Sequence, residues 1–242
     1  GYGDDLLIGG LGNDSLIGGD GSDTASYSTS SSAVSINLLS STYSGADAEG
    51  DTLTSIENIT GSDYADILVG DSQNNTLTGG LGEDQLNGGD GLDTASYSTS
   101  SSAVSINLLS SSFSGGDADG DSLTSIENII GSDYADLIIG DSQNNSLSGG
   151  AGNDTLYGGA GSNTYTGGSG DDFAVFNFAR SSATSISSTS VTTSSQTETL
   201  SGIEGKAFLE VNHGGSFVAG QAGFQDIDGD GKTDLILQNN SL

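Results

Sequence analysis

The stretch Gly9-Gly10-Leu11-Gly12-Asn13-Asp14-Ser15-Leu16-Ile17 decides the fold of this chain. Its first six residues are rich in glycine, which adopts the left-handed turns that residues with a Cβ resist. They end in an aspartate, which offers a hard oxygen ligand beside exposed backbone carbonyls. The last three residues form a minimal strand with one inward apolar side chain, Leu16. The nonapeptide therefore predicts a turn that binds a cation, followed by a strand that stacks on its neighbours.

The nonapeptide recurs in register along most of the chain. Its sixth position forms a column of Asp and Asn: Asp5, Asp14 and Asp23, then Asp66, Asn75, Asp84 and Asp93, then Asp136, Asn145, Asp154, Asn163 and Asp172. Two positions later comes a column of inward residues: Leu7, Leu16, Ala25, Leu68, Leu77, Leu86, Ala95, Ile138, Leu147, Leu156, Tyr165 and Ala174. Together the two columns indicate a solenoid with one inward side chain per strand.

A longer repeat with a period of about 70 residues lies over the short one. Residues 21–82 match residues 91–152 without a gap, at roughly four positions in five. We interpret this as the tandem duplication of a whole module. The two modules span about 21–90 and 91–160.

Each module contains a spacer between its blocks of nonapeptides. In the first module, Ala33–Leu38 and Leu53–Ile59 each read as a strand. We expect the spacer to be an extra or bulged coil of the same solenoid. The turn between the two strands is dense in carboxylates, and it either holds a further cation or is a solvated loop. Its candidate ligands are Asp47 and Asp51, with Asp117 and Asp121 at the same places in the second module.

The nonapeptide pattern ends near Phe176. We expect residues 1–175 to form the solenoid and residues 176–242 to form a small β cap over its end. Close to the C-terminus, Asp226, Asp228, Asp230 and Asp234 precede an apolar strand. This array resembles the start of an EF-hand calcium loop, but Leu237 stands where that loop needs a bidentate Glu. It favours a calcium loop between strands, with a plain turn as the alternative.

Composition excludes several classes of function. The chain has 33 acidic and 3 basic residues, a net charge of −30, 40 glycines and no cysteine. Such a chain repels itself and stays disordered by composition unless counter-charge is supplied. It is unsuited to nucleic acid or to insertion in an anionic membrane, which attract Lys and Arg. Disulfides and thiolate metal sites are absent, and a single histidine, His213, excludes a His-based centre. Divalent cations are the natural partners.

The repeated Gly-Gly-x-Gly-x-Asp-x-Leu-x pattern resembles the calcium-binding nonapeptide of the RTX (repeats-in-toxin) haemolysin-type family. The resemblance implies an all-β, right-handed parallel β-roll with Ca²⁺ in its turns. It also implies a bacterial protein that leaves the cell unfolded through a type I secretion channel and folds outside.

In a β-roll, one coil uses two nonapeptides, so turns two motifs apart stack and share a cation between their carboxylates and carbonyls. Four pairs supply two carboxylates: Asp5 with Asp23, Asp66 with Asp84, Asp136 with Asp154, and Asp154 with Asp172. Asn75 with Asp93 supplies one, and Asn145 with Asn163 supplies none. The alternative is that these side chains only close Asx turns. That explains single turns, but not a carboxylate column at fixed spacing.

Three functions fit to different degrees. A structural protein of a surface layer, filament or adhesin stalk is favoured by the tandem modules, and it would lie outside the cell, associate with itself and carry no catalytic residues. The second is the calcium-binding and secretion module of a larger exoenzyme. The chain lacks Met and starts inside a repeat, so we expect a fragment or a processed form. An enzyme in its own right has little support, since no nucleophile elbow of the Gly-x-Ser-x-Gly type occurs.

Overall fold

The computed structural model describes residues 1–178, 182–210, 222–225 and 234–238. The described residues are nearly all β, and they include the short 3₁₀ helices η1 (Ala46–Ala48) and η2 (Gly116–Ala118). Most strands pair in parallel, which confirms the predicted β-roll. In the described residues, no helix is long and apolar enough to span a membrane. The chain divides into two compact units, Gly1–Ile130 and Gly131–Leu242, which we describe in turn.

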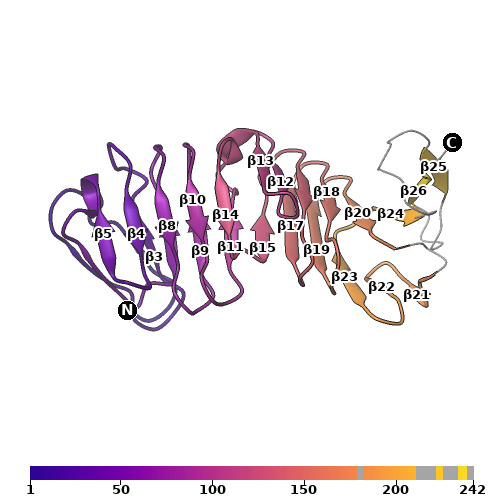
Figure 1. Cartoon of the computed structure of the whole chain (residues 1–242), viewed down its shortest axis with the longest axis horizontal. Coiled ribbons are helices and arrows are strands. Elements are labelled where there is room, and N and C mark those ends of the chain that lie inside the picture. The colour runs from indigo at the N-terminus through magenta and orange to yellow at the C-terminus, as the bar shows by residue number, and fades with distance from the viewer. Residues whose placement is uncertain (179–181, 211–221, 226–233, 239–242) are drawn as a thin grey trace. The chain divides into compact units, whose positions relative to one another are not determined.

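One face of the first unit is an unbroken parallel ladder of short strands (Figure 1). Across the sheet these are β1 (Leu6–Leu7), β3 (Thr24–Ser26), β7 (Asn58–Thr60), β9 (Thr76–Thr78), β11 (Thr94–Ser96) and β15 (Asn128–Ile130). The residue at the centre of each strand is aligned with the centre of the next. Ala25 pairs with Ile59 and Ile59 with Leu77. The inward side chains therefore form a continuous row.

The other face of the first unit is interrupted by the spacers. There β2 (Ser15–Ile17) pairs with β6 (Thr52–Thr54), and a separate ladder contains β4 (Ser35–Asn37), β8 (Ile67–Val69), β10 (Gln85–Asn87) and β14 (Ser122–Thr124). The spacer strand β4 joins β8, and the chain then returns so that β6 lies beside β2. The spacer is thus an extended coil of the same solenoid, as expected.

Each spacer also carries an antiparallel hairpin that the sequence did not indicate. In the first module β5 (Thr42–Ser44) folds back on β4, and in the second β13 (Ser112–Ser114) folds back on β12 (Ser105–Asn107). Each hairpin leads into one of the 3₁₀ helices.

The prediction of a single strand over Leu53–Ile59 is wrong. β6 and β7 lie in different sheets, and the chain turns between them at Ser55, whose φ is 50°. Ser125, at the same place in the second module, also has a φ of 50°. A serine with positive φ is uncommon. The apolar residues of Leu53–Ile59 continue on both sides of Ser55, so the sequence pattern did not predict the turn.

In the second unit the parallel pairing continues beyond Phe176, where the nonapeptide pattern ends (Figure 1). One ladder contains β16 (Leu137–Ile139), β18 (Thr155–Tyr157), β20 (Phe173–Phe176), β24 (Gly205–Glu210) and β26 (Asp234–Gln238), with β25 (Ala222–Gln225) antiparallel to β26. The other contains β17 (Ser146–Ala151), β19 (Thr164–Ser169) and β23 (Thr197–Ser201), followed by the antiparallel strands β22 (Ser190–Thr192) and β21 (Ser185–Ile186).

Most strands contribute a single inward side chain to the core. The predicted column of inward residues is confirmed, because all its members except the partly buried Leu7 are buried. Leu68, Leu77 and Leu156 have no exposed surface. In the second unit the row widens into an aromatic cluster, in which Phe176 packs against Tyr165, Phe178 and Phe208.

Candidate metal centres

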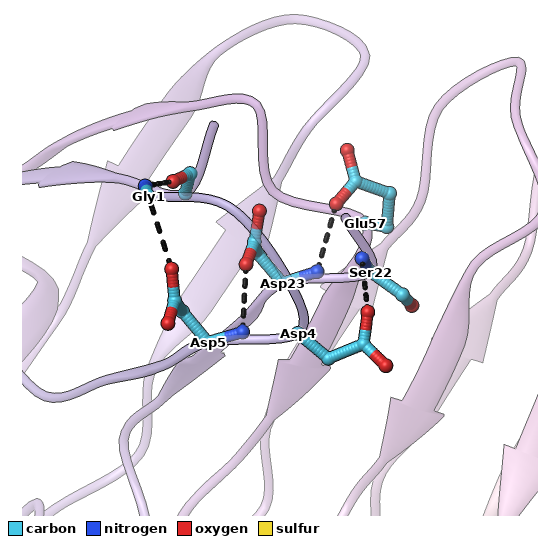
Figure 2. A network of polar contacts seen from close by, with 7 residues as sticks. Gly1, Asp4, Asp5, Ser22, Asp23 and Glu57 are labelled. Atoms are coloured by element: carbon cyan, nitrogen blue, oxygen red, sulfur yellow. Dashed lines mark hydrogen bonds and ion pairs between the residues drawn. The ribbon is translucent and has the colours of Figure 1, made fainter. Parts of the chain in front are cut away.

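The aspartates of the sixth column stack from one coil to the next. Each lies directly before a strand, and its backbone N–H donates to the Oδ1 atom of the aspartate one coil on. Asp5 donates in this way to Asp23 over 2.8 Å, as Figure 2 shows, and Asp154 donates to Asp172 over 2.8 Å. The same bond joins Asp66 to Asp84, Asn75 to Asp93, Asp136 to Asp154 and Asn145 to Asn163. The structure therefore brings together every pair that the spacing suggested.

The acidic turns of the spacers extend these columns. The backbone N–H of Asp14 donates to Oδ1 of Asp51 over 2.8 Å, and that of Asp84 donates to Asp121 over 2.9 Å, although 37 residues separate the partners. Asp51 and Asp121 are buried, so they are not part of a solvated loop. Asp47 and Asp117 are also buried, but they lie within η1 and η2 and not directly before a strand.

Four glutamates occupy column positions that sequence reasoning missed. Glu57 Oε2 accepts the N–H of Asp23 over 2.9 Å (Figure 2), and Glu127 accepts that of Asp93 over 2.9 Å. Glu198 and Glu204 accept the N–H groups of Asn163 and Asp172. A signal was present, since Glu57, Glu127 and Glu198 each have a buried Ile or Leu two positions later, as the aspartates do.

The second oxygen separates two classes of turn. In the turns that read Gly-Gly-x-Gly-x-Asp, the Oδ2 atom of the aspartate is buried and has no hydrogen-bond partner. These aspartates are Asp14, Asp23, Asp84, Asp93, Asp154 and Asp172. A buried, unpartnered carboxylate oxygen is costly in a folded protein. The same feature recurs at six turns, which indicates that these oxygens are ligand-binding groups.

Turns without the second and fourth glycine close on themselves. Oδ2 of Asp66 accepts the N–H of Ser62 over 2.5 Å, and Oδ2 of Asp136 accepts that of Ser132 over 2.6 Å. The Oδ1 atoms of Asn75 and Asn145 accept the N–H groups of Asp71 and Asp141 in the same way. These side chains act as Asx caps of their own turns. In the Asp66–Asp84 and Asp136–Asp154 pairs, the carboxylate of Asp66 or Asp136 therefore already accepts a hydrogen bond from its own turn.

The glycine that opens each Gly-Gly-x-Gly-x-Asp turn lies against the unpartnered oxygen. A Cβ at Gly149 would collide with Oδ2 of Asp154 and would lie 2.7 Å from the carbonyl oxygen of Gly167. A Cβ at Gly88 would lie 2.5 Å from Oδ2 of Asp93. Carboxylate and carbonyl oxygens thus converge on a place where a side chain does not fit. Several hard oxygens in a loop are the ligand set that Ca²⁺ prefers.

The donor set is mixed. In the described part of the chain, no three acidic or histidine side chains gather closely enough to hold a metal ion. A cation in these turns would therefore take one or two carboxylates and complete its shell with backbone carbonyls. The residues present fit calcium in that form. Asn163 does not fit calcium. Its amide nitrogen donates to the carbonyl of Ala160 over 3.2 Å, so the side chain places a hydrogen-bond donor inside its turn.

Burial has a direct electrostatic consequence in the metal-free protein. Desolvation raises the pKa of Asp84 to about 8 and, against opposing hydrogen bonds, raises the pKa values of Asp121 and Asp154 to about 6. Neighbouring carboxylates add to each shift. These sites favour a bound positive charge, whether a proton or a cation.

Part of the predicted C-terminal loop lies outside the described residues. Asp226, Asp228 and Asp230 belong to that part, and Asp234 is described only as the first residue of β26.

Comparison with known families identifies the repeats. A family model described as the RTX calcium-binding nonapeptide repeat matches the chain in four copies, at residues 1–26, 60–95, 124–156 and 139–174. A search of curated proteins found no match. The matched segments contain all six turns with an unpartnered Oδ2, whereas most of each spacer lies outside them.

Proposed function

This chain belongs to the RTX family of calcium-binding repeat proteins, and on that premise we propose that it is a secreted protein that folds on Ca²⁺ outside the bacterial cell. There it serves as a structural component of a surface layer, a filament or an adhesin stalk. It is not an enzyme. Calcium ions are its essential partners, and further copies of the chain are the partners in assembly.

The set of six buried, unpartnered Oδ2 atoms carries the proposal. Together with a net charge of −30, it makes the metal-free fold unfavourable. Each site filled by calcium adds about 1.4 kcal/mol when the free ion is at ten times its Kd. Several coupled sites reach the stability of an ordinary domain. A cytosol poor in calcium then keeps the chain unfolded for export, and external calcium folds it.

The structural role is supported by the way the modules join. In the first unit β9 pairs with β11 and β10 with β14, so coil stacking runs from the first module into the second without a break. Adding modules therefore adds length. We extend the proposal to residues 176–242 as a cap with a calcium loop at Asp226, Asp228, Asp230 and Asp234, and to Asp47, Asp51, Asp117 and Asp121 as carboxylates of the spacer sites.

Assembly is the property to test. The full chain, prepared free of metal, is examined by sedimentation velocity and electron microscopy in millimolar Ca²⁺ and, as a control, in millimolar Mg²⁺. We expect large ordered species in calcium alone. A folded monomer in calcium at every protein concentration would contradict the structural role and would favour the module of a larger exoenzyme.

A further inference from the structure

A five-residue motif recurs three times outside the nonapeptide pattern. It reads Leu-Thr/Ser-Ser/Gly-Ile-Glu and occurs at residues 53–57, 123–127 and 200–204. Its third residue is left-handed each time, with φ of 50° at Ser55, 50° at Ser125 and 58° at Gly202. Strained serines persist where the surrounding structure holds them, and they gather at ligand sites. The shared geometry indicates one local structure used three times.

Each copy docks on a Gly-Gly-x-Gly-x-Asp turn of the coil before it. The first copy shows the pattern: Gly18 donates to the carbonyl of Thr54 over 3.1 Å, and the N–H groups of Glu57 and Asn58 both donate to the carbonyl of Asp23. The second copy repeats these bonds, and the third repeats the paired bonds, to the carbonyl of Asp172. The motif therefore occupies the place that a further nonapeptide turn would occupy.

Its oxygens converge on the unpartnered aspartate. A Cβ at Gly18 would collide both with the carbonyl oxygen of Ser55 and with Oδ2 of Asp23. The corresponding oxygens are those of Ser125 and Asp93 at Gly88, and those of Gly202 and Asp172 at Gly167. The three aspartates have no exposed surface, and the Oδ2 atom of each lacks a partner. In each copy, the carbonyl oxygen of the residue with positive φ and the unpartnered Oδ2 atom of the aspartate therefore lie against the same glycine.

The glutamate completes the arrangement. Its Oε2 atom accepts the backbone N–H of the aspartate over 2.9, 2.9 and 3.0 Å in the three copies. In the columns of stacked nonapeptide turns, the same bond is accepted by Oδ1 of the aspartate in the next coil. Figure 2 shows Glu57 beside Asp23 in this position. Each place holds two carboxylates, whose charge balances one divalent cation.

We propose that the pairs Asp23–Glu57, Asp93–Glu127 and Asp172–Glu204 are three further calcium sites, each closed by the carbonyl of the left-handed residue. The inference rests on the proposed calcium-dependent function and deepens it. The motif lets a coil of irregular length end in a calcium site. The coils that contain the spacers therefore keep a calcium site at this position of the solenoid.

The test counts bound ions. Equilibrium dialysis against radioactive calcium compares the natural chain with the triple variant Glu57→Gln, Glu127→Gln, Glu204→Gln. The control triple, Glu49→Gln, Glu83→Gln, Asp119→Asn, removes the same charge from exposed side chains. Circular dichroism checks that each protein is folded at saturating calcium. We expect the motif triple to lose three ions per chain and the control to lose none.

The outcomes separate the two claims. If the motif triple binds as many ions as the natural chain, the inference is overturned while the calcium-dependent function stands. If the natural chain binds no calcium, the proposed function itself fails. Should the triple variant not fold, the single variants Glu57→Gln and Glu204→Gln decide, since each is expected to lose one ion, and an unchanged count in both would overturn the inference.

Discussion

An aspartate such as Asp154 has one oxygen held by a backbone N–H and the other buried without a partner. The exposed Asp133 nearby has the same charge but is solvated. At the scale of a residue, we propose that calcium binds the Oδ2 atom that neither water nor the chain reaches, and that it neutralises a charge that burial disfavours.

Replacing Asp154 by Asn should therefore weaken calcium-dependent folding, because the amide places a donor where the cation needs an oxygen. We expect the calcium concentration at the folding midpoint to rise about tenfold, the equivalent of about 1.4 kcal/mol. The midpoint is read from far-UV circular dichroism during a calcium titration. Asp133→Asn removes the same charge and should shift the midpoint less than about twofold. Equal shifts in the two variants would mean that charge alone matters.

The raised pKa values predict how the metal-free chain responds to acid. Burial raises the pKa of Asp84 from 3.8 to about 8, and it raises the pKa values of Asp121 and Asp154 to about 6. Between about pH 4 and 8 the folded state then binds more protons than the unfolded chain. The free energy of unfolding is greatest below this window and falls as the pH rises through it.

We expect the calcium-free chain to gain β signal in far-UV circular dichroism when the pH falls from 8 to 4.5. At neutral pH, calcium binding should release protons, which calorimetry in buffers of different ionisation enthalpy detects. A chain with the same coil spectrum at both pH values, and no proton release, would contradict this account of the buried carboxylates.

Much of the site at this scale was readable from the sequence, and the reason is physical. A nine-residue spacing fixes both the turn and the inward residue, so the aspartate pairs followed directly. Glu57, Glu127, Glu198 and Glu204 were missed because the motif specifies Asp and their turns lack the paired glycines. The closed turns at Asp66 and Asp136 were not predicted, since a carboxylate count does not show which oxygens the turn itself occupies.

At the scale of the element, the spacers are tied to the solenoid through buried tyrosines. The hydroxyl of Tyr27 donates to Oδ2 of Asp51 over 3.1 Å, and that of Tyr97 donates to Oδ2 of Asp121 over 2.9 Å. Burial and the neighbouring carboxylate raise the pKa of both tyrosines, which therefore remain donors. Each link holds an acidic spacer turn against the strand layer.

Tyr97→Phe should destabilise the calcium-loaded protein by about 2 kcal/mol, because it leaves a buried carboxylate oxygen without its donor. Tyr134→Phe, at a half-exposed tyrosine, is the control and should change stability by less than about 0.5 kcal/mol. Thermal unfolding in saturating calcium measures both. A Tyr97→Phe variant as stable as the control would show that Asp121 is held by other contacts.

The regular coils and the spacer's membership of the solenoid were predictable, since period-two alternation marks strands and nonapeptide spacing marks turns. The hairpins β4–β5 and β12–β13 were not predictable, because nothing in a Ser-rich run fixes the direction of the second strand. The break at Ser55 was missed for a related reason. Serine rarely adopts a positive φ, so the residue type at this position does not predict the break.

At the scale of the whole molecule, charge and fold oppose each other until cations bind. The chain carries 33 acidic residues and 3 basic ones, and its core is one side chain thick. Solenoid stability is a sum of small repeats and their interfaces. In the proposed function, calcium fills the turns at several of these interfaces, so the ions act as part of the core.

The central claim is that calcium is required for the fold. The direct test is far-UV circular dichroism of the full chain, prepared free of metal at pH 7.5 and titrated with Ca²⁺, with Mg²⁺ as the control ion. The account predicts a coil spectrum at the start and a cooperative change to β at submillimolar to millimolar calcium, with magnesium ineffective. A chain already β in the absence of calcium, and unchanged by its addition, would contradict the account and leave the aspartate columns as ordinary turns.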